Sequence, residues 1–118
     1  MYRKLLKAKI HRAVVTEADL HYEGSLTIDK NLLDATGICE HEMVQVVDID
    51  NGACLETYAL IGEAGLGEIK ANGAAARLIH PGDRIIIMTY GYVPEPELAD
   101  WSPSIVLVNE DNSIKEII

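Results

Sequence analysis

The sequence predicts a single, mainly β domain with an internal twofold repeat, and three observations carry this prediction. The 118-residue chain has no phenylalanine, so its core must consist of Val, Ile, Leu and Ala, of which the β-branched residues favour strands. Asp50-Asn51-Gly52 lies between two apolar runs and is a strong hairpin signal. Ile28 and Val46 recur as Ile69 and Ile87, each 41 positions later. Two such units closing on each other would form a pseudo-symmetric barrel within residues 1–118.

The first half of the chain is expected to alternate short strands with one helix. Asp29 is placed to cap that helix and Gly37 to end it. The expected elements, in order, are a strand over 5–16, a turn or helical turn over 17–20, a strand over 25–28, the helix over 30–36, a strand over 42–49, its hairpin partner over 54–61, and a loop over 63–67.

The second half is expected to repeat the pattern of strand, short helix, turn and strand. Chance similarity of two amphipathic units remains the alternative explanation. The matching pairs are Ile28 and Ile69, Asn31 and Asn72, Ala35 and Ala76, Ile38 and Ile79, Glu42 and Asp83, Val44 and Ile85, and Val46 and Ile87. Beyond them we expect a short helix after Pro94, with proline in its first turn, a strand over 104–108, and a turn at 111–112.

Composition excludes several classes of function. The net charge of −9 argues against nucleic-acid binding, which needs a basic surface. No apolar run reaches the length of a membrane span, and no secretory segment is expected because basic residues interrupt the N-terminal run. The local basic cluster Lys4, Lys7, Lys9 and Arg12 suits either an anionic substrate or a solvated edge strand.

Cys39 and Cys54 are too few and too widely spaced for a disulfide framework or a zinc site. Two reduced thiols in a cytosolic protein are the expectation. The chain also lacks a metal-ligand cluster, a phosphate-binding loop and a nucleotide fingerprint.

Gly24-Ser25 is the candidate centre of chemistry. Glycine adopts backbone conformations that other residues avoid, and on a tight turn the Ser25 hydroxyl could attack the Gly24 carbonyl. The peptide would become an ester through a tetrahedral oxyanion that needs a nearby donor. β-Elimination and hydrolysis would then leave a pyruvoyl group. A plain Gly-Ser turn is the alternative.

Longer motifs extend over nearly the whole chain. They are Lys9-Ile10-His11-Arg12, the run from Val15 to Ser25, Asn51-Gly52, Thr57-Tyr58-Ala59, Asn72-Gly73-Ala74-Ala75-Ala76, Gly82-Asp83 and Ile85-Ile86-Ile87. In order and spacing this set resembles the pyruvoyl-dependent aspartate decarboxylase family. The resemblance implies a six-stranded double-psi β-barrel, which agrees with the repeat, and a cytoplasmic homotetramer with active sites at subunit interfaces.

The resemblance also implies a zymogen that cleaves itself into residues 1–24 (β chain) and 25–118 (α chain). Its cofactor would be a pyruvoyl group derived from Ser25, whose ketone forms a Schiff base with the substrate amine. The implied reaction is conversion of L-aspartate to β-alanine and CO₂ for pantothenate and coenzyme A synthesis.

Site roles follow from the same resemblance. Tyr58 would protonate carbon, while Thr57 would bind substrate and assist cleavage. Neighbouring residues of a regular strand point to opposite faces, so one strand cannot aim both at one site without a twist, a bulge or a subunit boundary. Gly73, Ala74 and Ala75 would contact substrate at a helix start that Asn72 caps.

Lys9 would contact the substrate carboxylate, with His11 and Tyr22 flanking the site. Cys54 departs from the family pattern, which has arginine at this position. The departure makes a pyruvoyl decarboxylase for another amino acid one rival. Two further rivals are a self-cleaving hydrolase whose freed Ser25 amine is the base, and an uncleaved barrel used as an assembly or binding module.

Overall fold

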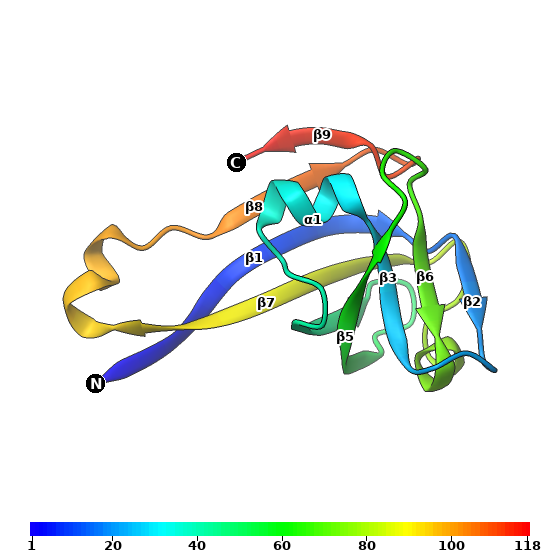
Figure 1. The fold of residues 1–118 in the computed structure, drawn as a ribbon, viewed down its shortest axis with the longest axis horizontal. Helices are drawn as coiled ribbons and strands as arrows, with labels where there is room; N and C mark the ends of the chain where they lie inside the picture. Colours follow the sequence, from blue (N-terminus) through cyan, green and yellow to red (C-terminus); the bar gives the residue numbers. More distant parts are fainter.

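The computed structural model describes residues 1–118 and is mainly β (Figure 1). It contains nine strands, one α-helix and two short 3₁₀ helices. In chain order they are β1 Tyr2–Val14, β2 Glu17–Asp19, β3 Ser25–Asp29, α1 Lys30–Thr36, β4 Met43–Asp48, β5 Cys54–Gly62, β6 Ile69–Asn72, η1 Gly73–Arg77, β7 Arg84–Pro94, η2 Glu95–Asp100, β8 Ser104–Val108 and β9 Ile114–Ile117.

All nine strands belong to one hydrogen-bonded sheet with the order β2-β6-β3-β5-β4-β7-β1-β8-β9. Figure 1 shows β1 and β7 running along the long axis of the molecule, while β3, β5 and β6 cross them steeply. The sheet therefore curls over on itself and encloses a single core. The predicted mainly β class is confirmed, whereas the expected count of six strands is not.

The strand pairings show that the sequence repeat is a structural symmetry. Antiparallel β3 and β6 place Ile28 opposite Ile69, and antiparallel β4 and β7 place Val46 opposite Ile87. The 41-residue sequence repeat matches the same residues with each other. When a residue in an antiparallel pair faces its own equivalent, a local twofold axis passes between the two strands. Chance similarity of the two halves is therefore rejected.

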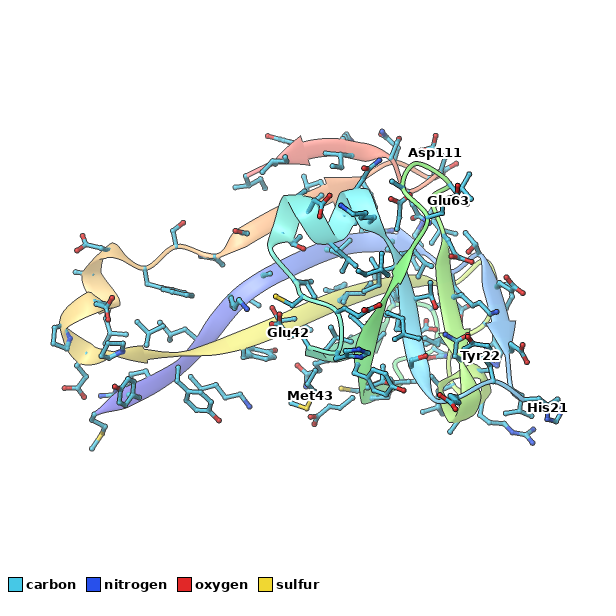
Figure 2. All side chains as sticks on the ribbon, in the orientation of Figure 1. His21, Tyr22, Glu42, Met43, Glu63 and Asp111 are labelled. Carbon is cyan, nitrogen blue, oxygen red and sulfur yellow. The ribbon has the colours of Figure 1, made fainter.

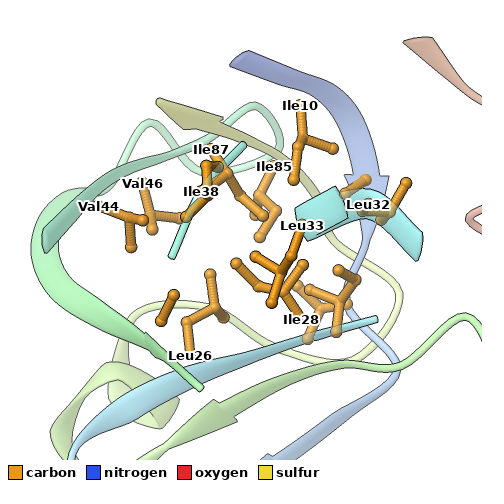
Figure 3. Packing of buried hydrophobic residues seen from close by; sticks show 14 of the residues in the cluster. Ile10, Leu26, Ile28, Leu32, Leu33, Ile38, Val44, Val46, Ile85 and Ile87 are labelled. Carbon is orange, nitrogen blue, oxygen red and sulfur yellow. The ribbon is translucent and has the colours of Figure 1, made fainter. Parts of the chain in front are cut away.

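The core is a cluster of 19 buried aliphatic side chains (Figure 3). It combines Ile10 of β1, the inward residues of β3, β4 and β7, and Leu32 and Leu33 of α1, which covers one side of the fold. Each fully buried residue of this size contributes on the order of 1.5–3 kcal/mol. Close-packed aliphatic side chains therefore fill the core without phenylalanine.

Asp29 fixes the helix and the following loop together. Its Oδ1 accepts from Asn31 N at 2.8 Å, and its Oδ2 accepts from Gly67 N at 2.7 Å and Gly65 N at 3.1 Å. Gly37 ends the helix with φ = 77° and donates to Leu33 O. Both predicted helix boundaries are confirmed.

Three expectations about the strands are wrong. Residues 17–20 were expected to turn, but Glu17–Asp19 form β2, which pairs in parallel with β6. The tail strand β9 was not expected. β1 is not an edge strand, because it lies between β7 and β8. The pairings of β2 with β6 and of β1 with β7 and β8 join segments far apart in sequence, and no local pattern reports them.

No helix of the structure has the length and apolarity needed to cross a membrane.

We predict that Asp29→Ala destabilises the fold. The substitution leaves the N–H groups of Asn31, Gly65 and Gly67 without their acceptor, and loss of the acceptor of a buried group such as Gly67 N costs about 1–3 kcal/mol. The free energy of unfolding in urea should fall by at least ~2 kcal/mol, whereas the exposed control Asp34→Ala should change it by less than ~0.5 kcal/mol. Equal losses in the two variants would contradict the role of Asp29.

Candidate active site

The Gly24-Ser25 junction lies at the start of β3. Ser25 is completely buried. Its hydroxyl donates to Glu23 O at 3.0 Å, and its Oγ accepts from Asn72 Nδ2 at 2.9 Å. The serine oxygen is therefore held in one orientation beside the peptide bond that precedes it.

Asn72 orients the serine rather than capping a helix. The β3–β6 register places Asn72 opposite Ser25, and its two amide hydrogens are shared between Ser25 Oγ and Thr27 Oγ1, the latter at 3.0 Å. It makes no side-chain cap bond, and η1 is a five-residue 3₁₀ helix. Asn72 is therefore at the N-cap position of η1, as predicted, but its side chain does not cap, and no anion site follows from this helix start. Asn72 Oδ1 is buried and has no partner.

Gly73 permits the close approach of η1 to the junction. It has φ = 69°, and a Cβ at this position would lie 2.7 Å from Gly24 Cα, 2.8 Å from Gly24 N and 2.9 Å from Tyr22 O. No other residue fits this backbone and this space. The predicted site residue Gly73 therefore lies against Gly24.

A pocket of about 180 Å³ opens beside the junction. Five of the predicted residues are close to it: Gly24, Thr57, Ala74, Ala75 and Asn72 line it. Sequence reasoning missed the other lining residues, because no local motif marks them. They are Leu55, Glu56 and Leu78.

Thr57 and Tyr58 point to opposite faces of β5, as expected. Thr57 is opposite the buried Val44, while Tyr58 is opposite Met43, which is 56% exposed. Thr57 accordingly lines the pocket and Tyr58 does not. The Tyr58 ring lies 6.2 Å from that of His41.

The face that carries Tyr58 also carries the other predicted substrate contacts. The register forms a cross-strand row on this outer face, in the order His11, Ile86, Val47 and Cys54. Lys9 lies two residues from His11 on the same face of β1, and Cys54 is a free, exposed thiol. The chain therefore presents Lys9, His11, Cys54 and Tyr58 on one face of the sheet, and none of them lines the pocket.

His11 is electrostatically suited to remain neutral. Burial lowers its pKa, and the positive charges of Lys9 and Arg12 lower the pKa further. Its Nδ1 is buried without a partner. A neutral imidazole in this row can exchange a hydrogen bond but adds no charge to the two neighbouring cations.

Tyr22 lies at the end of the molecule next to His21 (Figure 2). Its side chain is about half exposed, and the Lys70 ammonium lies 4.8 Å from the ring centroid. Only its backbone carbonyl approaches the position of Gly73. The ring therefore flanks the junction without entering the pocket.

Comparison with known proteins identifies the family of the chain. A family model described as "Aspartate decarboxylase" matches residues 1–115. The chain is 57% identical over 117 residues to a protein of Clostridium botulinum (strain Alaska E43 / Type E3) named "Aspartate 1-decarboxylase", and 56% identical over 117 residues to one of the same name from Clostridium beijerinckii. Each alignment covers 99% of this chain and 94% of the relative. The chain belongs to the aspartate decarboxylase family.

Proposed function

We propose that the chain cleaves itself between Gly24 and Ser25 and then decarboxylates L-aspartate to β-alanine and CO₂, in pantothenate and coenzyme A synthesis. The observation that carries the proposal is the buried, doubly hydrogen-bonded Ser25 hydroxyl beside a peptide bond that lines a pocket. Family membership supports the substrate, since both relatives are named for aspartate.

The cleavage step uses residues already in place. The Ser25 oxygen attacks the Gly24 carbonyl carbon, and the C–N bond breaks in favour of an ester. Asn72 fixes the oxygen, and Gly73 leaves the room that the Gly24 backbone needs. Thr57 lines the same pocket as Gly24. Its hydroxyl is the group that would donate a hydrogen bond to the oxyanion.

The buried position of Ser25 suits a small pyruvoyl group, whose methyl would replace the serine Cβ and whose ketone oxygen would replace the serine nitrogen, beside the pocket that Gly24 and Asn72 line. Such a group supplies an electrophilic ketone and an electron sink for decarboxylation. Ala74 and Ala75 leave space for the substrate beside it. The Tyr58 phenol holds the proton that carbon receives after CO₂ leaves.

Assembly of several copies of the chain would bring Tyr58 and Lys9 of one copy to the pocket of another. Neither Tyr58 nor Lys9 lines the pocket of its own chain. An outer face against the pocket of a neighbouring copy would complete each site, which supports a homotetramer with interfacial sites. The outer-face region also exposes apolar side chains, including Met43 (56%) and Tyr92 (73%). Two free cysteines agree with a cytoplasmic location.

Mass spectrometry of the denatured protein separates this function from its rivals. A large fragment that begins at residue 25, has a blocked N-terminus and is lighter by one ammonia supports a pyruvoyl enzyme. A fragment with a free N-terminal serine supports a hydrolase, and an intact chain supports a binding module. Because Cys54 replaces the usual arginine, a pyruvoyl decarboxylase for another amino acid is a further alternative. Assays with a panel of amino acids distinguish it from an aspartate decarboxylase.

We predict that Ser25→Ala yields one intact, folded and inactive chain, because the hydroxyl oxygen is both nucleophile and leaving group. Denaturing mass spectrometry checks the intact mass, and circular dichroism checks the fold. Thr27→Val, which removes the other hydroxyl bound by Asn72, should still give two fragments. Two fragments from Ser25→Ala would show that the cleavage site is misassigned.

We predict that Tyr58→Phe separates cleavage from turnover. The phenol protonates carbon and is not needed to break the backbone, so the variant should cleave fully while kcat falls at least ~10²-fold, the usual contribution of a general acid. Tyr90→Phe removes a phenol that donates to Gln45 Oε1 and should keep near-native kcat. Normal release of β-alanine by Tyr58→Phe would remove Tyr58 from the role.

We predict that Cys54→Arg lowers KM for aspartate at least tenfold without changing the extent of cleavage. A guanidinium grips a carboxylate with two hydrogen bonds, and a charged hydrogen bond adds ~1.5–3 kcal/mol, or roughly ten- to a hundredfold in affinity. Cys39→Arg, at the other exposed cysteine, is the control. An unchanged KM in Cys54→Arg would show that arginine is dispensable here, and a native preference for an amino acid without a side-chain carboxylate would refute the substrate.

A further inference from the structure

Asp48, the last residue of β4, is a completely buried carboxyl group. Its Oδ1 accepts from Asp50 N at 2.8 Å and Asn51 N at 3.2 Å. Its Oδ2 is buried and has no such donor. A buried carboxylate oxygen without a partner is costly, so the position calls for a positive group or a proton.

Two further carboxyl groups face Asp48. Asp50 lies in the β4–β5 turn, and Asp83 lies in the turn before β7. One oxygen of each lies within 4.8 Å of one oxygen of the other two. Backbone groups hold both neighbours, since Arg84 N donates to Asp50 Oδ2 at 2.7 Å and His80 N donates to Asp83 Oδ2 at 3.0 Å.

The cationic side chains near this group pair with carboxylates other than that of Asp48. The Arg84 guanidinium donates to Glu110 Oε1 at 3.0 Å. His80 Nδ1 lies 3.7 Å from Asp83 Oδ2, and its side chain is 56% exposed. Asp50, Asp83, His80 and Arg84 are the titratable or charged groups that face Asp48 from the two turns and from β7. None of the cations among them contacts the Asp48 carboxyl.

We propose that Asp48 is protonated in the folded protein and donates its hydrogen to Asp83, so that one shared proton fastens the β4–β5 turn to the turn before β7. Asp48 Oδ2 then becomes a donor and no longer lacks a partner. The pKa values agree with this arrangement. Burial raises the pKa of Asp48, and the hydrogen bond with Asp48 is the main cause that lowers the pKa of Asp83.

We call the Asp48–Asp83 contact the latch. It is linked to the candidate site through Asn51 and Leu78. Asn51, in the latched turn, donates from Nδ2 to Leu78 O at 2.8 Å, and Leu78 lines the pocket beside Gly24. The same turn leads into β5, which carries Cys54, Thr57 and Tyr58. Loss of the shared proton therefore loosens the segment that presents these side chains.

The sign of the pH dependence follows from the two shifts. A raised pKa means that the Asp48 contribution is complete at low pH and is lost as pH rises through the pKa of the folded state. A lowered pKa means that the Asp83 contribution is lost as pH falls through its own folded-state pKa. The latch is therefore strongest between the two pKa values, where the pair holds one proton, and it weakens as pH rises through the folded-state pKa of Asp48.

Asp48→Asn tests the proposal, because asparagine has the shape of protonated aspartate, keeps Oδ1 as an acceptor and donates to Asp83 without titrating. The melting temperature is measured from mildly acidic to alkaline pH for the wild type, Asp48→Asn and the exposed control Asp100→Asn. The wild type and the control should fall below Asp48→Asn by at least roughly 3 °C at alkaline pH. Parallel curves for all three proteins would overturn the proposal.

Infrared spectroscopy of the wild type provides a second measurement that does not depend on folding of the variant. A protonated carboxyl C=O band should persist at a pH where ordinary carboxyl groups are ionised, and it should be absent from Asp48→Asn. Absence of this band from the wild type would overturn the proposal.

Discussion

The antiparallel pairing of β3 with β6 is the interaction on which the rest of the structure depends. It joins the two repeats at their twofold axis, with Ile28 opposite Ile69 inside the core. The same register places Ser25 opposite Asn72 and lets Gly73 lie against Gly24. A slip of one residue would turn every side chain of the strand to the other face. The core and the chemistry are therefore set by one alignment, and the apolar pairs that stabilise the sheet also aim the serine.

Strand alternation explains why the candidate site is divided. Thr57 and Tyr58 point to opposite faces of β5, and only Thr57 lines the pocket within a chain. An enzyme that needs both must recruit the outer face of another copy. The physical basis of the proposed assembly is thus the two-residue period of a β-strand, and the exposed apolar residues of that face are consistent with burial against a neighbour.

Two buried aspartates illustrate two solutions to one problem. Both oxygens of Asp29 accept hydrogen bonds from backbone N–H groups, and the loop folds around them. Only one oxygen of Asp48 is served in this way, which is why we assign a shared proton to the other. A buried polar atom must find a partner, and the kind of partner decides whether the contact depends on pH.

The sequence by itself determined the features that rest on neighbouring residues. Asp29 and Gly37 marked the ends of α1, Asn51-Gly52 marked the hairpin, and the 41-residue repeat with its motifs indicated the barrel and the family. Only the tertiary structure decided that residues 17–19 form a strand, that Asn72 binds Ser25 instead of capping a helix, and that Asp48 meets Asp83. Caps and turns are closed by atoms a few residues apart, so their signals are local. Strand partners and buried polar pairs join residues separated by 35 to 53 positions, and their geometry exists only once the sheet has curled around its core.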